Sequence, residues 1–156
     1  MNVRRRLTTA AVALALPVLT AGLSGCGFDA PTDQRYNPAV GVNVQGGEVD
    51  ALNVLIVSGS DGSGALVATF ANNNQDEGDS LVDVSGQGVQ VELGGDTEIP
   101  AGGLLTIDDG SVTVTGERVA AGNFVPLTFS FENASSVTLQ APVVAPTGPF
   151  EDIPLP

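Results

Sequence analysis

The feature of this sequence that most constrains its fold is a period-two alternation of apolar and polar residues in short segments. From Leu127 to Glu132 every second residue is leucine or phenylalanine, and the residues between them are threonine, serine and glutamate. Residues 137–141 repeat the alternation after the intervening segment Asn133–Ser136. Because this period places alternate side chains on opposite faces of a strand, the pattern predicts two strands that pair as an antiparallel hairpin.

Similar short runs of β-branched and apolar residues recur earlier in the chain, separated by clusters of Gly, Asn, Asp and Ser, and no segment has a helical period. Short strands with regular turn signals are typical of sandwiches and barrels. The sequence therefore predicts an all-β fold for residues 40–143, an antiparallel two-sheet sandwich that is cupredoxin-like or immunoglobulin-like. The other expected strands are residues 40–44, 51–57, 65–71, 81–84, 89–93, 104–107 and 111–115.

The end of the chain is rich in proline, with Pro142 followed by four more prolines up to Pro156. Proline has no N–H to donate to a neighbouring strand, so a dense series of prolines is not expected inside a central strand. We predict that residues 144–156 form an extended, disordered tail.

The beginning of the chain resembles a secretion signal. A basic start at residues 4–6 precedes an apolar stretch over residues 7–23, which is the order of a signal peptide. The segment contains Pro17 and several threonines, so a spanning helix is the weaker interpretation. It ends in four residues that resemble the lipobox of bacterial lipoproteins: Leu23, Ser24, Gly25 and Cys26.

The lipobox resemblance implies that residues 1–25 are removed by a signal peptidase that recognises Leu23, Ser24 and Gly25, and that Cys26 carries a diacylglyceryl group. The alternative is a buried free thiol that only happens to follow an apolar run. Two acyl chains anchor a protein far more firmly than one. We therefore expect a lipoprotein on the extracytoplasmic face of the cell membrane, with residues 26–39 as its tether.

Charge excludes several functions. Five arginines stand against 18 acidic residues, giving a net charge of −13, and there is no lysine or histidine. A nucleic-acid partner is not expected, because a basic surface cannot be built from so few arginines. A serine nucleophile has no histidine or lysine to act as its base. Paired carboxylates remain the alternative for catalysis, but we expect no enzyme activity and no cofactor.

Four segments of the sequence resemble the periplasmic copper chaperone family PCuAC. The resemblance runs from about residue 49 to residue 143, and acidic actinobacterial envelope lipoproteins of the same broad family are more similar still. It implies a cupredoxin-like β-sandwich. The segments that carry it are residues 80–85, Ile99–Gly103, Val125–Glu132 and Val137–Val143.

The resemblance also implies where a copper site would lie. In the family, one His follows a strand of the Val-Glu-Leu type, and a His-x-Met pair lies on a later strand. The approximate counterparts here are Gly94, which follows Val91-Glu92-Leu93, and Val112 and Val114. None of the three is a ligand, whereas Cu(I) selects thiolate, thioether and imidazole. We therefore expect no copper site and no other metal site of this type.

One loop concentrates oxygen donors: Asn74, Asp76, Glu77 and Asp79 lie within eight residues that begin at Asn72. Calcium accepts six to eight such oxygens, but the spacing of a calcium-binding loop is absent. A solvated hairpin loop is the alternative, because Asn, Asp and Gly are ordinary turn residues.

These observations predict a lipid-anchored, non-enzymatic β-sandwich of the cell envelope that resembles copper chaperones, lacks their ligands and has a partner-binding or structural role. Its partner would be the membrane, through the lipid on Cys26, and an envelope protein that the sequence does not name. The aromatic residues expected in the flexible ends of the chain, Phe28, Tyr36 and Phe150, could bind such a partner. The alternative is an extracytoplasmic metal or solute carrier with oxygen ligands.

Overall fold

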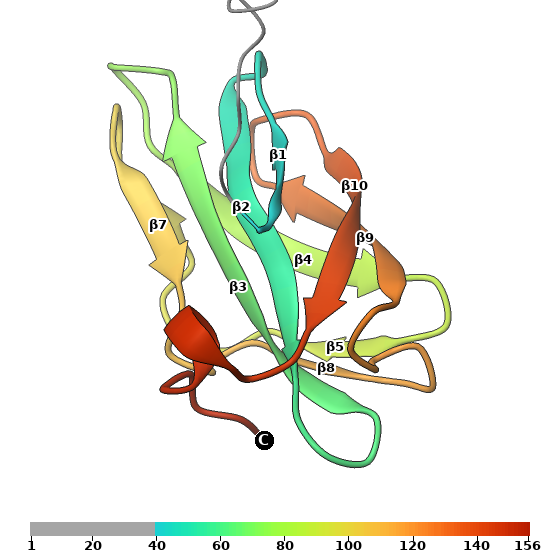
Figure 1. The fold of residues 1–156 in the computed structure, drawn as a ribbon. Coiled ribbons are helices and arrows are strands. Elements are labelled where there is room, and N and C mark those ends of the chain that lie inside the picture. The colour runs from blue at the N-terminus through green and yellow to red at the C-terminus, as the bar shows by residue number, and fades with distance from the viewer. Residues whose placement is uncertain (1–39) are drawn as a thin grey trace, which may run out of the picture. The chain divides into compact units, whose positions relative to one another are not determined.

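Ten strands and one short 3-10 helix follow one another along residues 40–156, the part of the chain that this computed structural model describes (Figure 1). The predicted signal peptide, lipobox and tether lie outside this part, so they remain predictions. The strands are β1 Val42–Val44, β2 Val49–Ser58, β3 Ser63–Asn72, β4 Asp79–Gly86, β5 Gln90–Glu92, β6 Glu98–Ile99, β7 Leu104–Ile107, β8 Thr113–Thr115, β9 Phe124–Phe131 and β10 Val137–Val144, and the helix is η2 Gly148–Phe150.

The strands form one continuous curled sheet in the order β5-β8-β3-β2-β10-β9-β4-β6, with β1 paired to β2 and β7 paired to β3. The curl makes two layers, one around β2 and β3 and the other around β9, β10 and β4. All pairings are antiparallel except that of β10 with β2, which joins the layers through Val143 opposite Ile56 and Val144 opposite Val57. The predicted all-β sandwich is thus confirmed, with this parallel ladder as a feature that the sequence did not indicate.

The longest pairing, between β2 and β3, shows how local sequence sets the fold. The turn between these strands contains Asp61 and Gly62, both with positive φ, at 57° and 74°. Positive φ at two successive turn residues gives the backbone twist that a tight hairpin needs, and Asp-Gly is a favoured pair for it. The expected hairpin of β9 and β10 also forms, with Val137 opposite Phe129.

Apolar side chains from both layers fill the space between them. Phe70 on β3 lies between two phenylalanines of β9, with ring centroids 5.1 Å from Phe129 and 5.6 Å from Phe131. All three rings are buried, and such tilted aromatic pairs contribute beyond their buried area. The alternation predicted for residues 127–131 therefore faces the core as expected.

The bounds of the predicted strands differ from the observed ones by up to three residues at an end, except for β7, which matches, and two further differences have a physical reason. The two-residue strand β6 was not predicted, because a segment of Glu98 and Ile99 is too short to alternate. Strand β10 runs through Pro142 to Val144. Val143 donates its N–H to the carbonyl of Asn123, the residue before β9. Because successive N–H groups of a strand point to opposite sides, the N–H that Pro142 lacks would point toward β2. The pairing with β2 begins only at Val143. The proline therefore interrupts no hydrogen bond of the ladder.

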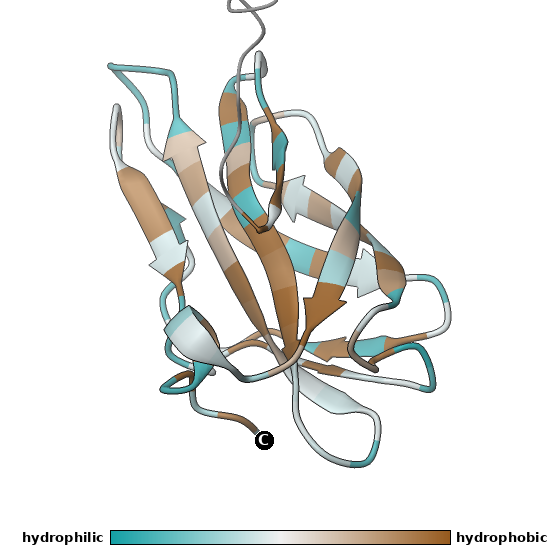
Figure 2. Cartoon of the chain, in the orientation of Figure 1, coloured by the Kyte–Doolittle hydropathy of each residue, from teal (hydrophilic) through white to brown (hydrophobic). Residues whose placement is uncertain are grey.

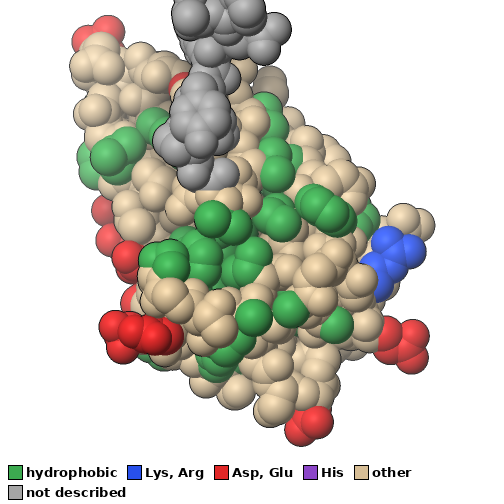
Figure 3. Space-filling view, viewed as in Figure 1, with side chains coloured by type: hydrophobic (Ala, Val, Ile, Leu, Met, Phe, Trp, Pro, Cys, Tyr) green, Lys and Arg blue, Asp and Glu red, His purple; other side chains and the backbone are tan. Residues whose placement is uncertain are grey.

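The prediction of a disordered tail is wrong for residues 144–156. Leu55, Val57 and Val67 lie on the outer side of the β2–β3 layer, and Phe150 and Leu155 of the C-terminal segment pack against them with Val144 and Ile153. Figure 2 shows the apolar run in the lower half of β2, and Figure 3 shows hydrophobic side chains gathered on this side of the molecule. Burial of apolar surface orders a segment whose composition alone suggested disorder. No helix within residues 40–156 is long and apolar enough to span a membrane.

Candidate functional site

The first candidate site is the place where the resemblance puts copper ligands. Gly94 follows β5, and a Cβ built on it would lie 2.7 Å from the carbonyl oxygen of Ser111, just before β8. A Cβ on Gly95 would lie 2.8 Å from the Ser111 Oγ. The fold therefore brings together the two segments around Gly94 and Ser111, and glycine allows them to approach this closely.

The side chains at this place face in two directions. Val112 and Val114 are fully buried in the core, so a side chain at either position points away from solvent. Ser111 and Thr113 are the alternate residues and are half-exposed. Ser111, Thr113 and Gly94 carry neither sulfur nor imidazole, so this place has no donor that selects Cu(I).

The predicted oxygen-donor loop uses its polar groups to hold its own backbone. The Asn74 Oδ1 accepts the N–H groups of Asp76 at 3.0 Å and Glu77 at 3.2 Å. Asn72 Oδ1 accepts the N–H of Asn74, and its Nδ2 donates to the carbonyl of Glu77. These are the local bonds by which asparagine stabilises turns. The solvated-loop alternative describes this segment best.

Asp79 has a different role from the other residues of that loop. Its carboxylate is buried and accepts the N–H groups of Ser80 at 2.7 Å, Asn133 at 3.0 Å and Ala134 at 2.8 Å. Burial by itself would raise the pKa of the Asp79 carboxyl, but the backbone N–H donors, Asn133 first among them, outweigh it and lower the pKa. Asp79 thus fixes the turn between β9 and β10 to the start of β4.

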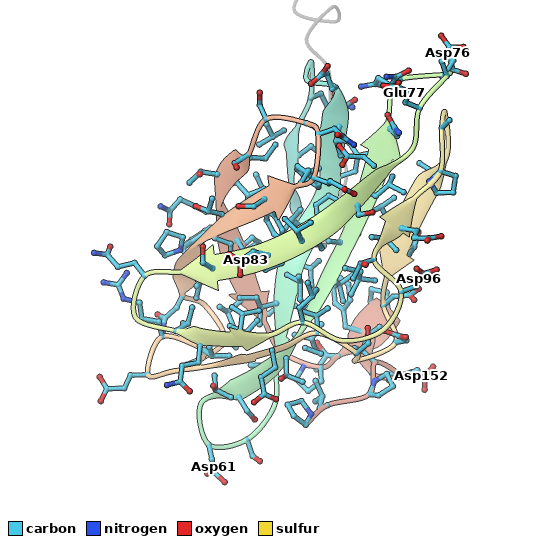
Figure 4. All side chains as sticks on the ribbon, turned by 180° about the vertical axis from the view of Figure 1, so that it is seen from behind. Asp61, Asp76, Glu77, Asp83, Asp96 and Asp152 are labelled. Atoms are coloured by element: carbon cyan, nitrogen blue, oxygen red, sulfur yellow. The ribbon has the colours of Figure 1, made fainter. Side chains whose placement is uncertain are left out.

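The remaining carboxylates are dispersed. Figure 4 labels Asp76 and Glu77 together in the β3–β4 connection, and Asp61, Asp83, Asp96 and Asp152 at separate points of the surface. Within residues 40–156 no group of three or more His, Cys, Asp or Glu side chains is placed to hold a metal ion. At the 108–110 turn, hydrogen bonds from the side chain and backbone of Ser111 lower the pKa of the Asp109 carboxyl, as expected of a turn.

A pocket of about 650 Å³ lies at one end of the sandwich. Three connections line it: that between β1 and β2, that between β3 and β4, and the β9–β10 turn, all at the upper end of the view in Figure 1. Nothing in the sequence indicated this pocket, because most of its residues are ordinary turn-forming types. The lining residues are Gly46, Gly47, Glu48, Val49, Asn73, Asn74, Ser135, Ser136 and Val137.

The curled two-layer sheet defines residues 40–156 as a cupredoxin-like domain with the PCuAC fold. Three solved structures share it: a copper-bound PCuAC domain from PmoF2 (TM-score 0.54, 21% identity, covering 67% of this chain and 99% of that domain), an apo PCuAC domain from PmoF1 (0.56, 20%, 67% and 100%) and the apo PmoF2 PCuAC domain (0.54, 20%, 69% and 98%). The expected resemblance to PCuAC domains is thereby confirmed for the fold. No family model and no curated protein sequence matches the chain.

Proposed function

We propose that this protein is a lipid-anchored, non-enzymatic component of the cell envelope that uses a PCuAC-type sandwich to bind a partner or support an envelope assembly. The PmoF2 PCuAC domain is described as copper-bound. This protein would share the fold of that domain without binding copper.

The observation that carries the proposal is the chemistry at the juncture of Gly94 with Ser111. The fold keeps these segments in contact, yet the side chains there offer only hydrogen, hydroxyl or carboxylate groups, with no sulfur or imidazole. Beyond Cys26 the sequence has no Met, His or Cys. Soft ligands are what Cu(I) requires, so a copper-carrying role has no chemical support in this chain.

A Cu(I) competition titration tests this part of the proposal. The full chain, purified in detergent under reducing conditions, is titrated against a chromogenic Cu(I) chelator. We expect the chelator to keep the copper. Submicromolar Cu(I) affinity that persists in a Cys26→Ala variant would refute the proposal.

The lipid anchor is tested by mass spectrometry. After processing before Cys26, trypsin would cut next at Arg35, the first basic residue of the processed chain. We expect the peptide 26–35 to carry the mass of a diacylglyceryl group, and Cys26→Ala to accumulate as the unprocessed chain. An unmodified Cys26 in membrane fractions would contradict lipid anchoring.

The alternative, a carrier with oxygen ligands, has less support because Asn74 and Asp79 already accept backbone N–H groups. Calcium binding to the folded state would raise the melting temperature. A titration that raises it in the wild type and not in Glu77→Gln would favour the carrier over the proposed role.

A further inference from the structure

We infer that the pocket at the loop end of the sandwich binds a segment of a neutral polysaccharide, whose chain continues along the hydroxyl-bearing outer face of β9 and β10. This inference rests on the proposed binding role in the envelope. The two can fail separately, because binding of an oligosaccharide reports neither acylation nor Cu(I) affinity.

The size and the polar lining of the pocket are the first evidence for a saccharide ligand. At about 650 Å³ it lies within the range of small-molecule sites. Its rim offers Asn73 Oδ1, Asn74 Nδ2 and the hydroxyls of Ser135 and Ser136, whereas Asn73 Nδ2 and Asn74 Oδ1 are bound to the backbone. Amides and hydroxyls both donate and accept hydrogen bonds, which is what the adjacent hydroxyls of a sugar ring require.

The walls of the pocket are held in place without a ligand. Asn73 donates its backbone N–H to the carbonyl of Glu48 at 2.8 Å and its Nδ2 to the carbonyl of Gly47 at 2.9 Å. On the opposite wall, the Asp79 carboxylate holds the turn that presents Ser135 and Ser136, through Ala134. A preformed site loses less conformational entropy when it binds.

Charge selects the class of ligand. Glu48 is the single charged residue of the nine that line the pocket, although the chain carries a net charge of −13. That net charge repels anionic polymers, and a cationic partner would meet more carboxylates elsewhere on the surface (Figure 4). An uncharged ligand that needs hydrogen bonds matches the pocket.

A track of hydroxyls leads from the pocket onto the outer face. Ser136 Oγ hydrogen-bonds Ser130 Oγ at 3.4 Å, and Thr128 Oγ1 lies 2.9 Å from Thr138 Oγ1 across β9 and β10. Ser85 on β4 stands opposite Thr128. Figure 4 shows this side of the molecule, with β4 and the labelled Asp83 toward the viewer.

The track ends at an apolar edge. Phe124 is 58% exposed and pairs with Pro142, so its ring is available to the C–H face of a sugar. From Ser136 to Pro142 the track spans about 20 Å at the rise of a strand. A ligand that follows it must contain several sugar units, which predicts that affinity rises with chain length.

Saturation-transfer NMR on the full chain in detergent tests the inference. The probes are three neutral hexasaccharides, maltohexaose, cellohexaose and mannohexaose, with maltose, cellobiose and mannobiose as their short counterparts. We expect transfer to at least one hexasaccharide and weaker transfer to its disaccharide. The double variant Ser135→Ala/Ser136→Ala should weaken hexasaccharide binding about fivefold or more.

Two further variants sharpen the test. Thr128→Val/Thr138→Val should weaken hexasaccharide binding and leave disaccharide binding unchanged, because it alters only the track. Ser60→Ala is the matched control, since Ser60 is an exposed turn serine in the β2–β3 connection, at the lower end of Figure 1. It should change neither.

Four results would overturn the inference. The first is no saturation transfer to any neutral probe at millimolar concentration. The second and third are an equal loss of hexasaccharide binding in Ser60→Ala and in Ser135→Ala/Ser136→Ala, and hexasaccharide binding that Ser135→Ala/Ser136→Ala leaves unchanged. The fourth is self-association, measured by light scattering, that Ser135→Ala/Ser136→Ala abolishes. Binding restricted to an anionic polysaccharide or to a lysine-rich peptide would likewise replace it.

Discussion

The carboxylate Oδ2 of Asp79 accepts the backbone N–H of Ala134 at 2.8 Å, across 55 residues of sequence. With the N–H of Asn133 bound to Oδ1, one buried acid closes the turn of the last hairpin onto the first residue of β4. The same turn presents Ser135 and Ser136 to the pocket. Asp79 is therefore a positioning residue for the proposed saccharide site as well as a structural one.

Asp79→Asn should destabilise the fold. The amide nitrogen cannot accept an N–H, so at least one part-buried backbone donor loses its charged partner, at a cost of about 2 kcal/mol. For a domain of this size we expect a melting temperature roughly 8 °C lower by circular dichroism.

The matched control is Asp83→Asn on the same strand. Asp83 is exposed, so its substitution should change the unfolding free energy by no more than about 0.5 kcal/mol. Equal effects of the two variants would contradict the role assigned to Asp79.

The contribution of Asp79 should depend on pH. Hydrogen bonds lower the pKa of its carboxyl in the folded state, so ionised Asp79 stabilises the fold. That stabilisation is complete above the unfolded pKa of about 3.9 and is lost as pH falls through the lower folded pKa. The stability gap between wild type and Asp79→Asn should therefore be constant from about pH 5 to 7 and shrink below about pH 4. Chemical denaturation across this range measures it, and a gap that widens in acid would refute the assignment.

Gly110→Ala should release the C-terminal segment. A Cβ at Gly110 would lie 2.5 Å from the carbonyl oxygen of Pro154, whereas a Cβ at Gly88 would meet nothing within 4 Å. The two glycines have nearly equal φ, 75° and 78°, so both alanine variants carry the same left-handed strain, about 1–2 kcal/mol.

Only Gly110→Ala should also displace the segment that covers Leu55 and Val57. We expect a lower melting temperature than for Gly88→Ala, and increased binding of a hydrophobic dye. Identical behaviour of the two variants would show that the Pro154 contact contributes nothing to stability.

Grafting a His-x-Met pair should succeed at one register and fail at the next. Val112→His/Val114→Met places an imidazole in a fully buried site, which should cost at least about 2 kcal/mol. Ser111→His/Thr113→Met lies on the half-exposed face beside Gly94; it removes the hydrogen bond from the Ser111 side chain to Asp109 but buries no imidazole, so it should lower the melting temperature much less. Thermal unfolding of both variants checks this, and equal stability would contradict the burial of Val112 and Val114.

The sequence was sufficient for features that depend on neighbouring residues. Alternation in residues 127–131 predicted which phenylalanines face the core, and the segment Asn133–Ser136 predicted the hairpin turn. Leu104–Ile107 was predicted at its observed bounds. These features follow from the fixed period of a strand and from the local preferences of turn residues.

The sequence was insufficient where burial depends on a distant partner. Pro142 suggested the end of a strand, but its missing N–H falls where the parallel ladder has not begun. The prolines of residues 144–156 suggested a disordered tail, but Phe150 and Leu155 in that segment pack against the outer surface of β2, almost a hundred residues earlier. The pocket escaped notice because glycine, asparagine and serine have the same local pattern in a plain turn and in a binding site.

By itself the sequence determined the strand-rich fold class and the absence of Met, His and Cys beyond Cys26, because alternation and residue chemistry are local properties. The tertiary structure alone decided that Gly94 meets Ser111, that Asp79 closes the last hairpin, and that three connections line an open pocket. Each of these depends on how the curled sheet brings distant segments together, and long-range pairing of strands is not encoded in any single segment.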